Sequence, residues 1–320
     1  QVLSSAASDV YKRQVMSGYS IITPDQRANH LKSQGPKILL TGQFGVGKTY
    51  TIQTIPKNMK TIVLDIESGL MTVNQWLRTK SGDHVQTIKI AEFQDFLDIT
   101  VLACGPDRSA SPQSPMSQAH HDHVMTTRKA AGHDVDAEKK MFQDADVFFI
   151  DSISDLTKLA FAHAKQRETT NNLMRVYGNM AQDVLNSLRH WQHNHMKTVI
   201  FSCKLNSIED DLGRITYEIE AEGRRIKNEL PGIVDEVLTL AFIPQPPKDG
   251  VKQEPFRAFV CTSPNPGGYP AKDRSGRLEG IEQPHWGNLF KKMRNGGTEE
   301  ESTTNQTSAP VVPQPNGDNI

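Results

Sequence analysis

The sequence has few of the residues that mark a secreted or membrane-bound protein. Only 3 of its 320 residues are cysteine, and they lie far apart, at Cys104, Cys203 and Cys261. This spacing offers no disulfide framework, so we expect reduced cysteines in a cytoplasmic protein. No apolar run approaches the length of about 20 residues that spans a bilayer. We therefore expect a soluble protein without a membrane partner.

The sequence also lacks an excess of charge of either sign. It has 36 Lys and Arg against 37 Asp and Glu, and its pI is about 6.9. This balance excludes nucleic-acid binding through the overall charge of the protein, but it does not exclude binding through a local basic patch. The length suits one large α/β domain with decorations, or two small domains.

Both ends of the chain lack a folding signal. Residues 4–14 look like the translated adapter of a sequencing library, so residues 1–15 are interpreted as an artefact or a disordered extension, with Met16 as the natural start. Residues 294–320 are mostly Gly, Thr, Asn, Pro and Glu, which predicts a disordered tail. We expect the folded domain to span residues 16–293.

The motif Gly42-x-x-x-x-Gly47-Lys48-Thr49 has the spacing of a phosphate-binding P-loop. An apolar strand precedes it and a stretch able to form a helix follows it, which is the context that phosphate binding requires. Glycine lets backbone N–H groups close around a phosphate, Lys48 reaches the β- and γ-phosphates, and the Thr49 hydroxyl ligates Mg²⁺. The expected nucleotide-binding residues are Gly42, Gln43, Phe44, Gly45, Val46, Gly47, Lys48, Thr49 and Tyr50.

Short apolar strands alternate with helical stretches along most of the chain. This alternation predicts an α/β fold with a doubly wound, mainly parallel sheet and flanking helices. The expected strands are 60–67, 85–90, 147–152, 198–203, 234–242 and 257–262, with a hairpin within 206–222. The expected helices are 70–77, 93–104, 153–165, 174–195 and 284–293.

The segment 105–129 interrupts this pattern. It is rich in Ser, Pro, Gln and His, which predicts an exposed, mobile insertion. His120, His121 and His123 within it are compatible with a metal site, but a solvated loop is the favoured interpretation because no second ligand cluster accompanies them.

Two acids follow strands that end near the P-loop. Asp151 ends the apolar run 147–150 and is the candidate Mg²⁺-binding acid together with Thr49; the alternative is a helix cap. Glu67 ends the strand that follows the P-loop helix. Because ligands of open α/β sheets lie at the carboxyl ends of the strands, Glu67 is the candidate for orienting the attacking water, and an exposed acid is the alternative.

Lys272 and Arg274 lie two residues apart in a turn framed by Pro270 and Gly276. Two cations so placed are candidates for stabilising phosphate charge across a subunit interface. A charged surface turn is the alternative interpretation.

Five segments together resemble phage-type RecA-like P-loop ATPases of the AAA family of ATP-binding proteins, which are related to phage RecA-core single-strand annealing proteins. The resemblance covers roughly residues 36–104 and 145–293. Its segments are 42–49, 65–67, 149–153, 230–237 and 269–278.

The resemblance implies roles for the residues above: Lys48 and Thr49 on phosphate and Mg²⁺, Asp151 as the Walker B acid, and Glu67 as the water-polarising glutamate. The segment 272–276 is similar to a Lys-Asn-Arg-Phe-Gly motif of the RadA branch, which implies a finger role for Lys272 and Arg274, although Asp273 and Ser275 depart from it. The residue at the place of a γ-phosphate-sensing Gln is Lys204. The DNA-facing loop would fall within 206–229, where Arg224, Arg225 and Lys227 form the basic cluster.

The motifs thus predict an ATPase that uses ATP and Mg²⁺. The resemblance implies that it is encoded by a phage or prophage and acts in the bacterial cytoplasm on single-stranded DNA during recombination or replication. Its subunits would form a homo-oligomer with shared ATP sites. A nucleotide-dependent switch or loader with a protein partner is the main alternative, because segment 206–222 is acidic. A small-molecule kinase ranks last, because the 105–129 insertion lacks arginine clusters.

Overall fold

A computed structural model describes residues 34–294, apart from residues 171, 210, 212 and 214. The expectations for the adapter-like segment, for Met16 and for the tail after residue 294 lie outside these residues. A ten-stranded sheet with the order β10-β8-β7-β1-β5-β4-β2-β3 forms the centre, and β6 and β9 pair at its side with β5 and β7.

The middle of the sheet is parallel. Its strands are β1 Lys37–Gly42, β2 Thr61–Asp65, β3 Val85–Lys89, β4 Val147–Asp151, β5 Thr198–Glu209 and β7 Glu236–Ile243. All neighbouring pairs among them run in the same direction. β1 and β4 are buried throughout, which explains their continuous apolar sequence. The carboxyl ends of all six strands therefore meet at one edge of the sheet.

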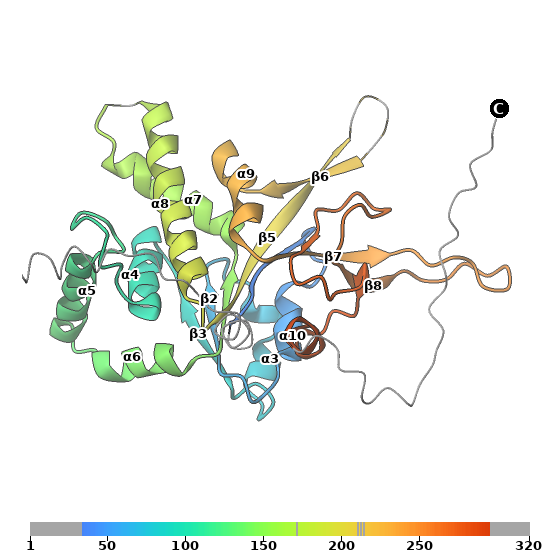
Figure 1. The fold of residues 1–320 in the computed structure, drawn as a ribbon, viewed down its shortest axis with the longest axis horizontal. Coiled ribbons are helices and arrows are strands. Elements are labelled where there is room, and N and C mark those ends of the chain that lie inside the picture. Colours follow the sequence, from blue (N-terminus) through green and yellow to red (C-terminus); the bar gives the residue numbers. More distant parts are fainter. Residues whose placement is uncertain (1–33, 171, 210, 212, 214, 295–320) are drawn as a thin grey trace, which may run out of the picture.

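Four antiparallel strands extend this parallel core: β6 Ile215–Glu220, β8 Phe256–Val260, β9 Lys272–Asp273 and β10 Ile281–Glu282. β5 and β6 form the hairpin expected within 206–222, although β5 itself continues to Glu209. β7 and β8 form a second hairpin, whose connection extends far from the body of the molecule (Figure 1).

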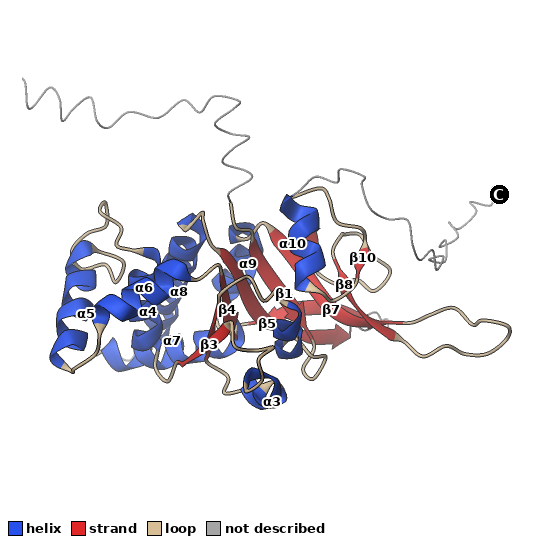
Figure 2. Cartoon of the chain, turned by 90° about the horizontal axis from the view of Figure 1, so that it is seen from below, coloured by secondary structure: helices blue, strands red, loops and turns tan. Residues whose placement is uncertain are grey.

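Helices cover both faces of the sheet, so it is doubly wound. One hydrophobic cluster joins the sheet to α4 Phe93–Cys104, α7 Ile153–Arg167, α8 Leu173–His193 and α9 Arg224–Ile233. The other joins it to the 3₁₀ helix η1 Thr49–Thr54 and to α10 Trp286–Arg294. In Figure 2, α4 to α8 gather at one end of the molecule, away from α10. The expected fold class, α/β with a doubly wound, mainly parallel sheet and flanking helices, is confirmed.

Local sequence explains where the principal helices begin. Glu92 and Asp95 form a capping box at the start of α4, and Ser152 and Asn172 accept backbone N–H groups at the starts of α7 and α8. In α8, the stripe of Met180, Val184, Leu188 and Trp191 expected from helical spacing is fully buried. These helices are fixed to the sheet by their apolar faces.

The prediction of an exposed, mobile insertion at 105–129 missed a helix in its second half. α5 Gln118–Ala130 begins there, capped by Ser117, and is followed by α6 Val135–Asp144. α5 contacts α4 through a 3.0 Å pair between His120 and Asp98, and it buries Val124. The composition concealed this helix because only one of its faces contacts the body. His121 pairs with Asp122, and the described part of the chain contains no group of three or more potential metal ligands.

Three smaller differences concern helices. The helix after the P-loop is a six-residue 3₁₀ helix, and the one expected at 70–77 is divided into η2 Leu70–Thr72 and α3 Asn74–Leu77. α9 was not predicted because Pro231 and Gly232 disfavour a helix, and both lie in its last turn. Among residues 34–294 with the gaps given above, no helix is long and apolar enough to cross a membrane.

Candidate active site

The P-loop follows β1 at the carboxyl edge of the sheet. Gly45 and Gly47 have φ angles of 74° and 96°, which L side chains rarely adopt, so glycine is required at both positions. Lys48 is 8% exposed, and its Nζ donates to the carbonyl oxygens of Gly42 and Gln43 at 2.8 and 3.1 Å. Burial lowers the pKa of Lys48. The ammonium group is therefore held inside the loop where phosphate would bind.

Asp151 meets the P-loop from β4. Its Oδ2 accepts a 2.7 Å hydrogen bond from the Thr49 hydroxyl, although 102 positions separate the two residues in the chain. Asp151 is 1% exposed, and its Oδ1 is buried without a hydrogen-bond partner among the residues that the structure describes. The Ser202 hydroxyl lies near Asp151, and it too has no hydrogen-bond partner within the described part of the chain.

These features fit a divalent cation. A buried carboxylate with an unpaired oxygen is costly, and burial raises the pKa of Asp151. A hard cation that takes oxygen ligands compensates this cost, and the Thr49 hydroxyl supplies a second oxygen beside the carboxylate. Thr49 and Asp151 are thus suited to hold Mg²⁺.

Glu67 lies at the neighbouring strand end. β2 pairs with β4, and the Glu67 backbone N–H donates to the carbonyl oxygen of Asp151 at 3.1 Å. The Glu67 side chain is 36% exposed and forms a 3.1 Å ion pair with Lys204 of β5. The structure therefore brings Glu67, Asp151 and Lys48 to one edge, as the sequence predicted from their positions after strands.

A chain of ion pairs continues from Glu67 toward the β5–β6 hairpin. Lys204 also pairs with Asp155 at 3.0 Å, and Asp155 pairs with Lys158 at 3.1 Å. Lys158 in turn contacts Glu220 at 3.4 Å, and Glu220 lies opposite Lys204 in the β5–β6 register. We call these residues (Glu67, Lys204, Asp155, Lys158 and Glu220) the ion-pair chain. It connects the candidate catalytic glutamate to the base of the hairpin.

Lys272 and Arg274 do not belong to the P-loop site of their own chain. β9 pairs with Glu236 and Val237 of β7, and these two residues pair in turn with the first half of β1. The P-loop follows the other end of β1, on the order of 10 Å away along the strand. Lys272 Nζ donates to the carbonyl oxygens of Pro231 and Val234, both at 2.6 Å. The structure thus places both cations toward the amino edge of the sheet.

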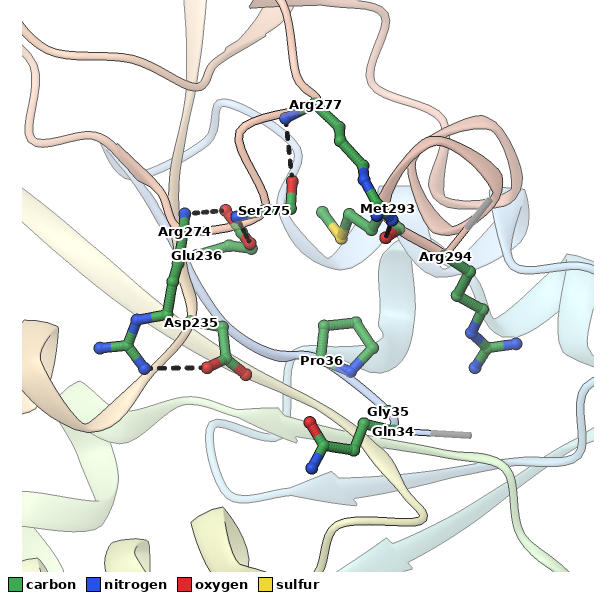
Figure 3. Close-up of a pocket in the computed structure, with 10 residues that line it drawn as sticks. All are labelled: Gln34, Gly35, Pro36, Asp235, Glu236, Arg274, Ser275, Arg277, Met293 and Arg294. Atoms are coloured by element: carbon green, nitrogen blue, oxygen red, sulfur yellow. Dashed lines mark hydrogen bonds and ion pairs between the residues drawn. The ribbon is translucent and has the colours of Figure 1, made fainter. Parts of the chain in front are cut away.

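Arg274 lines a cavity of about 370 Å³ at this amino edge, where it forms a 3.0 Å ion pair with Asp235 (Figure 3). Arg277 and Arg294 line the same cavity. Glu236 lines the cavity as well. It is buried, and its carboxylate accepts hydrogen bonds from the backbone N–H groups of Arg274 and Ser275. Burial and the nearby Asp273 raise the pKa of Glu236 to about 8. The turn that carries Arg274 is therefore fixed to β7.

Sequence reasoning missed two residues near the site. Asp155 lies in the first turn of α7, and its place three residues after the N-cap Ser152 could have drawn attention to it. Arg257 of β8 reaches the P-loop, with Nη1 at 3.5 Å from the Val46 carbonyl oxygen, and its guanidinium lies over the Tyr50 ring at 5.2 Å. No motif surrounds Arg257, so only the fold reveals it.

A family model described as an AAA domain matches residues 34–275, which is most of the chain. The protein belongs to the AAA domain family. This membership supports the expected AAA-type ATPase class. The matched range of this AAA domain protein includes the P-loop, Glu67 and Asp151, together with Lys272 and Arg274.

Two solved structures are similar to this AAA domain protein. A KaiC-like protein from the hyperthermophilic archaeon Pyrococcus horikoshii OT3 has 13% identity over 71% of this chain and 79% of its own, with a TM-score of 0.32. The flagellar accessory protein FlaH from Methanocaldococcus jannaschii has 12% identity over 79% of this chain and 90% of its own, with a TM-score of 0.34. No curated protein matches the sequence.

Proposed function

We propose that the protein binds Mg²⁺–ATP at Gly42–Tyr50 and hydrolyses it. The observation that carries this proposal is the convergence of the Thr49–Asp151 hydrogen bond, the unpaired Asp151 Oδ1 and the Glu67 carboxylate at the edge occupied by the P-loop. A phosphate cradle alone would bind nucleotide; the two acids add a cation site and a group that can orient water.

The residues have distinct tasks in this proposal. Lys48 exchanges its bonds to two loop carbonyls for bonds to the β- and γ-phosphates. Thr49 and Asp151 would hold Mg²⁺, which would supply positive charge beside the phosphates. Glu67 accepts a hydrogen bond from the attacking water and aligns it with the γ-phosphate. Lys204 holds the Glu67 carboxylate at the edge of the site.

We further propose that neighbouring copies of the chain share ATP sites. Lys272 and Arg274 lie at the opposite end of the sheet strands from their own P-loop, so any phosphate they contact must belong to another subunit. Arg274 is suited to this task because its side chain is 55% exposed despite the ion pair with Asp235.

Mixed assemblies test this arrangement. Arg274→Ala and Lys48→Ala subunits are expected to be inactive separately and to recover part of the ATPase rate when mixed, because some interfaces then combine an intact P-loop with an intact finger. The rate is measured against the mixing ratio, with co-assembly verified by light scattering. Mixed assemblies that show no recovery would contradict the shared site.

We propose that the ATPase acts on single-stranded DNA in phage recombination or replication, in the cytoplasm of a bacterial host. Arg224 and Arg225 are exposed at the start of α9, and with Tyr177 they line a groove of about 480 Å³. α9 begins just after Glu220, which is level with the end of β1, so the groove lies toward the ATP edge. Cations beside an aromatic ring suit a single strand, whose phosphates and bases they bind together.

ATP turnover with and without single-stranded DNA across a salt series tests this role. We expect single-stranded DNA to stimulate ATP turnover, and less so as the salt concentration rises. In Arg224→Ala/Arg225→Ala, the slope of the logarithm of the DNA-binding constant against the logarithm of the salt concentration should be shallower by about 0.7 for each lost phosphate contact. Lys129→Ala/Lys139→Ala, which removes two exposed lysines at α5 and α6, is the matched control and should bind as the wild type does.

A second candidate function is a nucleotide-dependent switch or loader with a protein partner. Residues 206–229 contain seven acids and four bases, and two of the basic residues are paired, Arg225 with Glu229 and Lys227 with Glu218. An acidic hairpin favours a basic protein surface over DNA. The absence of DNA stimulation at any salt concentration would support this candidate. A small-molecule kinase ranks last.

A further inference from the structure

Arg257 contacts the P-loop from a strand that no motif identifies. Its Nη1 lies 3.5 Å from the Val46 carbonyl oxygen and would lie 2.4 Å from a Cβ added at Gly47. Its guanidinium covers the Tyr50 ring at 5.2 Å from the ring centroid. A cation is thus held against the loop by β8, and its guanidinium forms no ion pair with a carboxylate of the described residues.

The strand order places this cation on a definite side of the loop. Glu67 and Asp151 approach from β2 and β4, beyond β5 on one side of β1. Arg257 approaches from β8, beyond β7 on the other side. Because the γ-phosphate must lie near Asp151 and Glu67, the α-phosphate and the nucleoside extend toward Arg257. The Thr49–Asp151 hydrogen bond fixes this direction.

Aromatic side chains lie on the Arg257 side. Phe242 is paired with Arg257 across β7 and β8, so the two side chains share a face of the sheet. This is the face of η1, because Leu240 and Phe259, each two residues away along their strands, join the hydrophobic cluster that contains Ile52. Phe242 is 55% exposed and Tyr50 is 42% exposed. A flat base can be stacked on such rings.

We propose that Arg257 binds the α-phosphate of the nucleotide and that Tyr50 and Phe242 contact its base. The inference rests on the proposed ATP site and defines its nucleoside end. Arg257 acts in its own subunit, in contrast to Lys272 and Arg274. It binds ATP and ADP alike, because both carry the α-phosphate, and it has no part in aligning the attacking water.

Dissociation constants for Mg²⁺–ATP, Mg²⁺–ADP and inorganic tripolyphosphate test the proposal. Arg257→Ala should weaken ATP and ADP equally, by about ten- to a hundredfold, which is the range for a lost hydrogen bond to a charged group. Arg257→Lys should recover part of the loss. Phe242→Ala should weaken ADP by about tenfold and leave tripolyphosphate unchanged, because tripolyphosphate has no base.

Lys252→Ala is the matched control, since Lys252 is an exposed cation on the β7–β8 connection, five residues before Arg257. Arg257→Gln retains a polar side chain if the alanine variant fails to fold, and the melting temperature without nucleotide reports folding. Unchanged ADP affinity in Arg257→Ala would overturn the inference, as would a loss confined to ATP. Failure of the wild-type protein to bind ATP would instead overturn the proposed function.

Discussion

Asp151→Asn is expected to reduce Mg²⁺-dependent ATP hydrolysis by about a thousandfold, corresponding to the several kcal/mol of charge stabilisation that a bound metal supplies. An amide cannot provide the negative charge that the cation requires, and its NH₂ group can turn toward the metal position. The concentration of Mg²⁺ for half-maximal activity should rise. The rate is measured over a Mg²⁺ series at saturating ATP.

The same substitution should leave the metal-free protein at least as stable as the wild type. Asp151 is 1% exposed with an unpaired Oδ1, so the charged carboxylate is more costly to bury than its neutral replacement. Asp146→Asn is the matched control, because Asp146 precedes the opposite end of β4, where it accepts the Lys60 backbone N–H. This control should lose stability and retain its Mg²⁺ dependence. Wild-type hydrolysis by Asp151→Asn would refute the metal role.

Glu67→Gln is expected to reduce the hydrolysis rate by about 10²- to 10⁴-fold and to leave ATP affinity nearly unchanged. The amide retains the size of the side chain and loses the charge that polarises water. Binding is followed by equilibrium titration with ATP, and the chemical step is followed in a single turnover. A large rise in the ATP dissociation constant would instead place Glu67 in nucleotide binding.

Lys204→Met removes the ion pair between Lys204 and Glu67 and leaves the Glu67 carboxylate able to contact water. If Glu67 acted only through its ion pair with Lys204, this variant would lose as much activity as Glu67→Gln. Because the Glu67 carboxylate is 36% exposed and retains its own contact with water, we expect a smaller loss, of roughly threefold to tenfold. Equal losses in the two variants would argue that Glu67 has a structural role.

The positions of site residues that follow the end of a strand could be predicted from the sequence. Asp151 and Glu67 each follow an apolar run, and parallel strands bring such ends to one edge, so their meeting with Lys48 follows from the order of the elements. The principal strands and α4, α7 and α8 were predicted for the same reason, since burial on one or both faces imposes a periodic pattern.

Residues fixed by packing across the sheet could not be predicted. Arg257 reaches Val46 only because β8 folds back on β7, and the two residues are 211 positions apart. Lys272 and Arg274 were correctly identified as a pair of cations near a turn, but their distance from the P-loop depends on the register of β9 with β7. α5 was missed because Val124 is its only side chain buried among the described residues.

The ion-pair chain has a thermodynamic consequence. Lys204 is shared between Glu67 and Asp155, and Asp155 and Glu220 share Lys158 at the base of the β5–β6 hairpin. A ligand that displaces the hairpin must alter these pairs, and a γ-phosphate that attracts Lys204 must alter them from the other end. Binding equilibria coupled in this way are reciprocal. Whatever factor a hairpin-bound ligand applies to ATP affinity, ATP must apply to the affinity for that ligand.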